Sequence, residues 1–489
     1  MKRIVLVASS LVAVAAFVGL HAPAEVEALP MYAMRSARTC GNCHLSPTYE
    51  DPDGWDNPEL AYRKCNMSCM ACHVNPTGGG MRAVGGRYYG QSTLSMYTLQ
   101  ERSYSDTGRE LFSAKTLNAI RKSYHEDGYV GPGGEGKFIP SDYEEVLAGV
   151  GQGQTGGWTA FGKPSSTPSR MSFWDGRYGD LNADPAFSFG GDLRGAFFSY
   201  EDGTNVFPMQ MDIHGAIQPV DYITAYVTAA GQGRTSGIDA VVNQPDPVYL
   251  RNAFLMVHEL PYMAYAKAGI FQPSFGTYID DHTSFTREYF ELDVSTPDST
   301  VYGVEVGAAP NYPFISASVF GNRVPQAVEL DDVNGGWGAA LNLGWRDIGW
   351  WASGHAMIKR RDLEARGDLD AAGVAWGFNP FNFSNSIPLT YLGEVSFGRR
   401  EGPVADSNTQ FVAMYHELWY TLFNGVSLRA KYDFGDVDLE LGQSNQHRFS
   451  GGFDVSPWPG ITVIGLVRHS INDDREDSSD LFIHTHVWF

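Results

Sequence analysis

The chain contains little cysteine and little positive charge. It has five cysteines in 489 residues, and none of them follows Cys72. Lysine and arginine number 35 against 56 aspartate and glutamate residues, which gives a formal net charge of −21. Because nothing forms a basic face that would pair with phosphates, nucleic acid is excluded as a partner.

Long apolar runs are also missing after the first 20 residues, so the sequence predicts no helix that spans a bilayer in the mature chain. At the start, Lys2 and Arg3 precede an apolar run from Ile4 to Leu20, and Ala22-Pro23-Ala24 follows it. A transmembrane helix is the alternative, but the run is short and ends at a cleavage-like site. We therefore predict a signal peptide over residues 1–24 and secretion to the periplasm or beyond.

Two motifs formed by the cysteines have the same spacing. The stretches 40–44 (CGNCH) and 69–73 (CMACH) are both C-x-x-C-H, the attachment motif of c-type haem. Two thiols at this spacing reach both vinyl groups of one porphyrin, and the adjacent histidine ligates the iron. A redox-active pair, a structural zinc site and disulfides of a secreted domain are the alternatives. We predict two covalently bound c-type haems, with these attachment residues and iron ligands: Cys40, Cys43, Cys69, Cys72, His44 and His73.

The other iron ligands are less constrained by the sequence. His125 is the one spare histidine of the N-terminal region, and we predict it as a distal ligand. The second haem then takes a methionine, takes a histidine from the second half of the chain, or keeps an open position. Cys65 is a bystander, a free thiol, a transient disulfide partner during haem attachment, or an unusual iron ligand. The nearby methionines are Met31, Met34, Met67, Met70, Met81 and Met96.

From Phe187 onward, runs of about ten residues alternate between apolar and polar side chains, which is the pattern of an outer-membrane β-barrel. In residues 206–218 the apolar face is expected to contain Phe207, Met209, Met211, Ile213 and Ile217. In residues 426–434 the polar face contains Ser427, Arg429, Lys431 and Asp433. In the last run, Phe482, His484, His486 and Trp488 share one face.

The connections between these runs favour a membrane barrel over a soluble β-sandwich. Short turns, such as 219–221 and 346–348, alternate with long polar loops, such as 233–247 and 274–300. Outer-membrane barrels have short turns on the periplasmic side and long loops outside, and the count reaches about 16 strands. Only Phe378–Pro388 is longer than the turn expected there. We also expect the long loops to point outward, where Asp280, Asp281 and His282 are solvated or collect cations.

The predicted fold class is therefore all-β: an antiparallel outer-membrane barrel preceded by a small irregular or helical dihaem cytochrome domain. The expected divisions are the signal peptide (1–24), the dihaem domain (25–100), a glycine-rich linker or plug (101–185) and the barrel (186–489). The haem domain is expected on the periplasmic side or within the barrel lumen.

This order of parts resembles the fused outer-membrane cytochrome–porins linked to extracellular iron(II) oxidation. In those proteins a short secreted C-x-x-C-H segment precedes a porin of similar strand number, so Cys40, Cys43 and His44 take the family's haem role. The second motif and residues 101–185 have no counterpart there. Residues 73–80 (HVNPTGGG) also look like segments of small cytochromes from metal-respiring bacteria.

The combination predicts an electron conduit between periplasmic carriers and an extracellular donor or acceptor such as iron. Two haems would divide the roughly 25 Å apolar band if their domain entered the lumen. A solute porin with an accessory periplasmic haem domain is the main alternative. A haem enzyme such as a peroxidase is a third and weaker alternative, because it would need an open iron position beside acid–base residues.

Overall fold

The computed structural model describes the barrel and a short part of the N-terminal region. The described residues are Cys69, 73–82, 187–200, 203–220, 222–233, 245–279, 281, 283–293, 299–309, 312–322, 336–347, 349–361, 367–380, 389–401, 408–423, 425–442, 444–458, 460–474 and 476–488. The predicted signal peptide and the linker over 101–185 lie outside these ranges.

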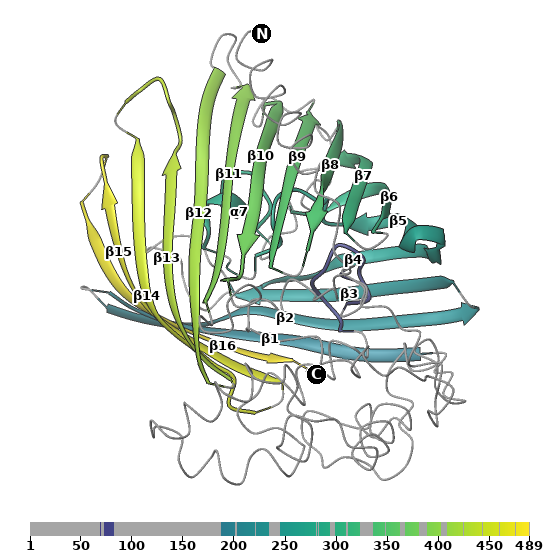
Figure 1. Ribbon diagram of the computed structural model, residues 1–489, viewed down its shortest axis with the longest axis horizontal. Coiled ribbons are helices and arrows are strands. Elements are labelled where there is room, and N and C mark those ends of the chain that lie inside the picture. The colour runs from purple at the N-terminus through teal and green to yellow at the C-terminus, as the bar shows by residue number, and fades with distance from the viewer. Residues whose placement is uncertain are drawn as a thin grey trace.

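Sixteen strands form one closed antiparallel barrel, in which each strand pairs with its neighbours in sequence and β1 pairs with β16 (Figure 1). Closure is visible in the register, where Asp192 lies opposite Trp488. The first eight strands are β1 (Phe187–Tyr200), β2 (Gly203–Val220), β3 (Ile223–Gly233), β4 (Pro245–Leu260), β5 (Ala264–Phe271), β6 (Val301–Ala308), β7 (Pro313–Asn322) and β8 (Trp337–Arg346). The other eight are β9 (Trp350–Arg360), β10 (Leu369–Phe378), β11 (Leu389–Glu401), β12 (Asn408–Phe423), β13 (Val426–Asp436), β14 (Asn445–Val455), β15 (Ile461–Asn472) and β16 (Ser478–Trp488).

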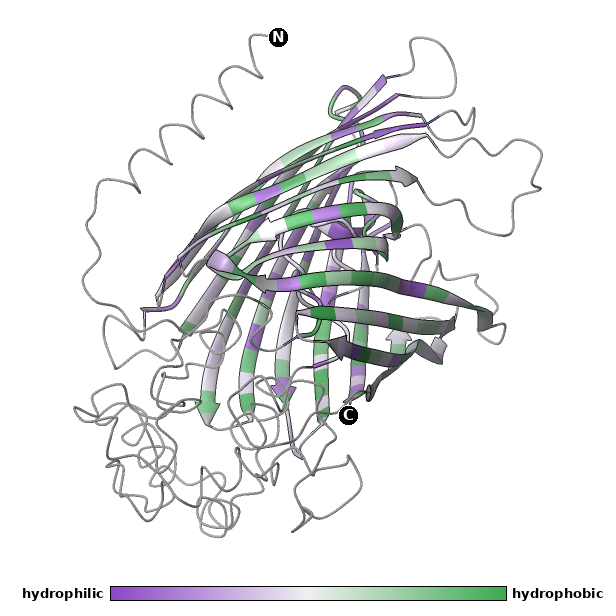
Figure 2. Ribbon diagram, turned by 90° about the vertical axis from the view of Figure 1, so that its right-hand side faces the viewer, coloured by the Kyte–Doolittle hydropathy of each residue, from purple (hydrophilic) through white to green (hydrophobic). Residues whose placement is uncertain are grey.

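Alternation along the strands gives the barrel an apolar outside and a polar inside. On β13, Leu428 is exposed on the outer face, while Arg429 and Lys431 are buried on the inner face. The same alternation of hydrophobic and hydrophilic residues recurs along the strands in Figure 2. Large apolar side chains around the outside would be costly in water and are favourable against lipid. The chain therefore forms an outer-membrane porin-like barrel, as the sequence predicted.

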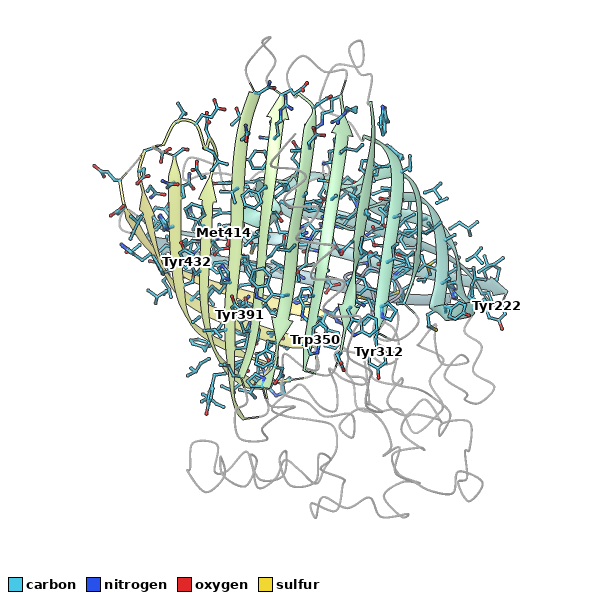
Figure 3. The ribbon with its side chains drawn as sticks, turned by 45° about the horizontal axis from the view of Figure 1, so that its top comes forward. Tyr222, Tyr312, Trp350, Tyr391, Met414 and Tyr432 are labelled. Atoms are coloured by element: carbon cyan, nitrogen blue, oxygen red, sulfur yellow. The ribbon has the colours of Figure 1, made fainter. Side chains whose placement is uncertain are left out.

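The two rims differ as expected. Short turns join β2 to β3, β4 to β5 through η7 (Pro261–Met263), β6 to β7 and β8 to β9. Tyr222, Tyr312 and Trp350 lie at such turns (Figure 3), where aromatic rings commonly sit at the membrane–water interface. The connection after Phe378 is longer than its neighbours on this rim, as the sequence indicated. Among the described residues, no helix is both long and apolar enough to cross a membrane.

Two expectations about side-chain placement are wrong. A β-bulge between β1 and β2 shifts the register after Arg194, which pairs with Gln210 while Gly195 pairs with Pro208. Phe207 and Met209 are consequently buried on the inner face, although their spacing placed them with the outward Met211. The sequence does not reveal this register shift, because a bulge inserts one residue into a strand without a distinctive change in residue types.

The second error concerns the loop between β5 and β6. It turns into the barrel instead of pointing outward, and contains the short helix α7 (Phe285–Glu288). Asp281 forms an ion pair with Lys431 of the inner wall, and its side chain is only 7% exposed. Asp281 is therefore not a surface ligand for cations, while Asp280 and His282 lie outside the described residues. In the loop between β15 and β16, Asp473 and Asp474 are exposed to solvent.

Candidate functional site in the barrel lumen

Part of the second C-x-x-C-H motif lies inside the barrel. The His73 amide donates a hydrogen bond to the Cys69 carbonyl at 2.8 Å, which brings the first and last residues of the motif together. The chain then reverses: the Val74 amide donates to the Met81 carbonyl at 3.0 Å, and His73 forms a β-bridge with Arg82. Residues 73–82 therefore form a compact segment, which we call the lumen hairpin.

Arg82 attaches the hairpin to the seam of the barrel between β1 and β16. Its Nη1 lies 2.9 Å from Asp192 Oδ1, and its guanidinium stacks 4.1 Å from the ring centroid of Trp488. Asp192 also receives two imidazoles, with His214 Nε2 at 2.8 Å and His486 Nε2 at 2.6 Å. Because all of these side chains face inward, the contact fixes the hairpin to the lumen wall.

Tyr226 of β3 provides a second attachment. Its hydroxyl accepts a hydrogen bond from the Met81 amide at 3.1 Å and lies 3.1 Å from His214 Nδ1. Gly80 has a φ of 63°, and a Cβ there would lie 2.5 Å from the Tyr226 hydroxyl oxygen. Glycine is required at this position both for the backbone conformation and for the close approach. Met81 itself is buried in the core with Tyr226 and Phe254.

A buried ion pair provides the third attachment. Lys267 of β5 and Glu305 of β6 lie 2.8 Å apart and have no exposed side-chain surface. The Lys267 ammonium also donates to Asn75 Oδ1 at 3.0 Å. A buried ammonium is costly unless several acceptors surround it. Asn75 of the hairpin therefore provides the Lys267 ammonium with an acceptor in addition to Glu305 of the wall.

The loop over residues 272–293 is fixed to the opposite part of the wall by further ion pairs. Arg287 Nη2 lies 3.5 Å from Glu394 Oε2, and the Thr277 amide donates to the same carboxylate at 2.7 Å. Glu291 meets Lys359, Arg361 and Arg400. Burial on its own raises the pKa of Glu291, but these three cations lower it to about 2. Lys431 and neighbouring arginines likewise hold the pKa of Asp281 well below its ordinary value, against the opposing effect of burial.

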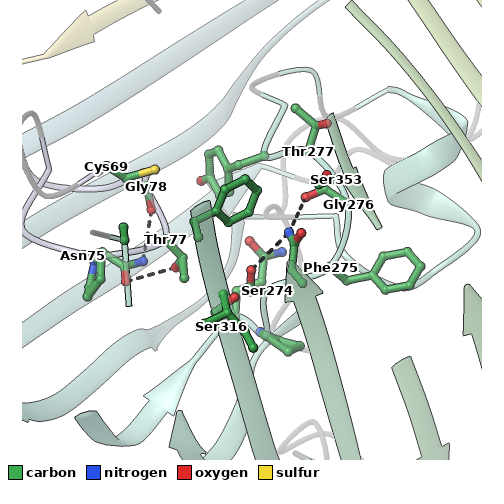
Figure 4. Close-up of a pocket in the computed structure, with 18 of the residues that line it drawn as sticks. Cys69, Asn75, Thr77, Gly78, Ser274, Phe275, Gly276, Thr277, Ser316 and Ser353 are labelled. Atoms are coloured by element: carbon green, nitrogen blue, oxygen red, sulfur yellow. Dashed lines mark hydrogen bonds between the residues drawn. The ribbon is translucent and has the colours of Figure 1, made fainter. Parts of the chain in front are cut away.

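Between the hairpin, the loop and the wall lies a cavity of about 90 Å³ that opens to the lumen (Figure 4). Cys69, Asn75 and Gly78 line it on the hairpin side, and Phe275 and Tyr278 line it on the loop side. Its wall includes aromatic side chains and two arginines, but no carboxylate among the described residues. The barrel wall contributes Tyr265, Phe314, Asn342, Arg346 and Trp351 to the lining.

Several buried polar atoms of this lining have no hydrogen-bond partner among the described residues. They are Arg287 Nε, Asn342 Oδ1 and Trp351 Nε1, on side chains that are 4%, 6% and 4% exposed. Buried polar groups are normally satisfied, so such a cluster indicates a polar occupant. At about 90 Å³ this space lies below the roughly 300 Å³ of an ordinary small-molecule pocket, so it suits water or a small polar group, with Cys69 at its edge.

The predicted haem residues are covered only in part. Cys69 lines the cavity and His73 begins the hairpin. Cys40, Cys43, His44, Cys72 and His125 lie outside the described residues, and so does Cys65. Their haem roles remain predictions. Nothing in the sequence marked Asp192, Lys267, Arg287 or Arg346 as site residues. Alternation places Asp192, Lys267 and Arg346 on the inner face, but their partners lie far away in the chain. Arg287 belongs to the loop helix α7, to which strand alternation does not apply.

No protein-family model matches the chain, and no curated protein matches it in sequence. Among solved structures, OmpT of Vibrio cholerae is 12% identical with a TM-score of 0.45, covering 62% of this chain and 97% of its own. The anion-selective porin from Comamonas acidovorans is 10% identical with a TM-score of 0.44, covering 62% and 99%. The outer-membrane channel DcaP of Acinetobacter baumannii is 13% identical with a TM-score of 0.43, covering 62% and 97%. Likeness at these identities concerns the fold alone.

Proposed function

We propose that this protein carries electrons across the outer membrane through c-type haems held in and near the barrel lumen. The observation that carries the proposal is the position of the second C-x-x-C-H motif: Cys69 borders a lumen cavity, and the hairpin after it is bound to the wall at three places. A haem domain that only hung below the barrel would need none of these contacts.

The residues at the motif suit haem attachment. A helical turn brings side chains three and four residues apart to one side, which is what one porphyrin requires of two thiols and a histidine. Cys69 and Cys72 would hold this haem through thioethers and His73 would ligate its iron, while Cys40, Cys43 and His44 would hold the first haem. His125 is proposed as a distal ligand. A bound haem supplies one-electron chemistry between ferrous and ferric iron.

Residues of the barrel wall and of the inward loop position the hairpin that would carry the haem. Asp192, Tyr226 and Lys267 position the hairpin, and the loop over 272–293 narrows the lumen beside it. The apolar outer face separates this interior from lipid. Periplasmic electron carriers and an extracellular redox partner, such as iron, are the proposed partners at the two ends.

A solute channel is the second candidate, favoured by the charged inner face of strands such as β13. The hairpin and the loop occupy part of the lumen, which argues against wide free passage. The two candidates make opposite predictions: a conduit passes electrons and few ions, whereas a solute channel passes ions and no electrons.

The test of haem attachment is the intact mass of protein produced in a periplasm that attaches c-type haem. We expect a gain of two haem groups over the mature apoprotein. His44→Ala and His73→Ala should each alter the spectrum of one haem. Liposomes that contain the protein should pass electrons from an internal reductant to an external oxidant. A mass gain of one haem or none, or two haems without electron transfer, contradicts the proposal.

A further inference from the structure

We propose that two copies of this chain associate side by side in the membrane through a row of tyrosine and histidine side chains on the outer face of β11–β14. The row, which we call the outer ladder, consists of Tyr391, His416, Tyr432 and His447. The inference goes beyond the proposed electron transfer and does not depend on a bound haem.

The outer ladder lies on the lipid-facing side of the wall. His416 points to the same side of β12 as Leu418, which is exposed on the outer face, and it lies directly opposite Tyr432 of β13. His447 likewise shares its side of β14 with the exposed Phe449. The ladder therefore crosses four adjacent strands on the surface that lipid would cover.

The row also runs from one rim of the barrel towards the other. Tyr391 lies near the short-turn end of β11, and His447 lies near the long-loop end of β14. His416 and Tyr432 are close to the middle of their strands. Figure 3 shows Tyr391 and Tyr432 along this part of the wall. The ladder thus reaches the middle of the apolar band.

Neighbouring members of the ladder contact each other. Ring centroids are 6.1 Å apart for Tyr391 and His416, 6.0 Å for His416 and Tyr432, and 6.1 Å for Tyr432 and His447. The Tyr391 hydroxyl lies 2.8 Å from His416 Nδ1, and the Tyr432 hydroxyl lies 2.9 Å from His447 Nδ1. Within the described residues, the Nε2 of neither imidazole has a hydrogen-bond partner.

A histidine at this depth is exceptional in this barrel. Away from the two rims, His416 is the one histidine or charged side chain on the outer face of the described strands. Hydrocarbon neither donates nor accepts hydrogen bonds, so an imidazole nitrogen exposed to it is costly in either tautomer. Ionisable side chains in membrane-spanning segments normally pair with other protein groups. The ladder is therefore better suited to face protein than lipid.

A second copy supplies polar partners at the same depth. Two copies in one membrane have the same orientation, so a two-fold axis along the membrane normal brings the same side chains together at the same level. The hydroxyl groups of one ladder can then bond to the Nε2 atoms of the other, and tyrosine rings provide a large, rigid contact area.

The outer face also favours a two-fold contact over a larger ring. In a ring of three or more copies, each contact joins two different patches, so a second polar patch would have to lie at the same depth. The outward side chains of the described strands provide no such patch away from the rims. The ladder is accordingly expected to meet itself.

The test is sedimentation equilibrium of the full-length holoprotein in density-matched detergent micelles. We expect the mass of two chains at high concentration and reversible dissociation on dilution. His416→Phe keeps a stacked ring without its nitrogens, and should raise the dissociation constant about tenfold or more, because a two-fold contact loses each interaction twice. His469→Phe is the matched control and should change nothing. His469 is on the outer face of β15, outside the ladder, with its Nδ1 2.9 Å from Ser479 Oγ.

A role confined to one chain would give a different result. If His416 only supported its own barrel through Tyr391, His416→Phe would lower the free energy of unfolding of the monomer and leave association unchanged. We expect the reverse, because phenylalanine is favourable against lipid. Urea unfolding at a concentration where the protein is monomeric provides this readout. If His416→Phe fails to fold, Tyr432→Phe, which removes a single hydroxyl, decides, and it should weaken association as well.

Cross-linking examines the same contact in the native membrane. A photoreactive benzophenone side chain in place of Leu418, beside His416, should join two copies. The same group in place of Leu255, exposed on the outer face of β4, should not. A monomer at every concentration, a trimer, or a dimer unaffected by His416→Phe overturns the proposal. Adducts of position 418 with lipid or with a different protein alone also overturn it.

Discussion

Asp192 brings together side chains from three separate parts of the chain: Arg82 of the hairpin, His214 of β2 and His486 of β16. Its carboxylate therefore links barrel closure to hairpin attachment. If Asp192 is replaced by asparagine, Arg82 loses its anionic partner. The amide side chain can still form neutral hydrogen bonds with the two imidazoles. The residue matters more for the hairpin than for the barrel.

Asp192→Asn should therefore loosen the hairpin without unfolding the barrel. Loss of a charged hydrogen-bond partner costs about 1–3 kcal/mol, so the protection of amides in residues 73–82 should fall about tenfold or more. Hydrogen exchange measured by mass spectrometry provides the readout. The control is Asp480→Asn, which breaks a lumen ion pair with Arg468 far from the hairpin. Equal loss of protection in both variants would mean that Asp192 has no specific role in attachment.

At the scale of elements, the loop between β5 and β6 is attached through its charges. Glu291 is surrounded by Lys359, Arg361 and Arg400, and its pKa is lowered from 4.5 to about 2. This difference corresponds to about 3 kcal/mol of preferential interaction with the ionised form. For a depressed pKa the contribution is complete above pH 4.5 and disappears as the pH falls through about 2.

The loop should accordingly stay attached at pH 4 and be released as the pH approaches 2. Glu291→Gln should weaken attachment at neutral pH as well. It should remove the part of the pH dependence that comes from Glu291, while the ion pair of Asp281 keeps its own part. Exchange rates of the amides in 285–292, corrected for the intrinsic effect of pH, provide the measurement. Glu440→Gln, at an exposed position in the connection after β13, should behave as wild type. A loop in the Glu291→Gln protein that remains as protected as in wild type would contradict this account.

At the scale of the whole molecule, the barrel excludes lipid while the hairpin and the inward loop fill part of its interior. Sixteen strands enclose a lumen that would otherwise pass water and small solutes. The conduit and the solute channel therefore differ in what the interior segments do: in the first they carry the cofactor, and in the second they merely narrow the path.

Planar bilayers and liposomes separate these possibilities. The full-length protein should pass few ions, and deletion of residues 29–100 should open the pore and abolish electron transfer. Cys69→Ala/Cys72→Ala is the sharper control, because it keeps the hairpin and removes one haem. Its conductance should stay low while its electron transfer falls. Large steady ionic conductance of the full-length protein, without electron transfer, would instead support the solute channel.

The sequence alone determined the barrel and its orientation of faces. Alternation with a period of two places Arg429 and Lys431 on one face because successive side chains of a strand point to opposite sides, and loop lengths then gave the strand number. The C-x-x-C-H motifs on which the proposed haems rest are likewise local, since such attachment would need residues that are close in the chain. Both predictions depend only on residues that lie a few positions apart in the chain, and such distances can be counted directly in the sequence.

The tertiary structure alone decided which distant residues meet. The contact of Arg82 with Asp192 joins positions 110 residues apart, and that of Asn75 with Lys267 joins positions 192 apart. The loop around Asp281 turned inward because buried cations on β13 and β14 attract it, and no local pattern distinguishes this loop from an external one. The bulge at Met209 and the cavity beside Cys69 depend on register and packing, which only the closed barrel fixes.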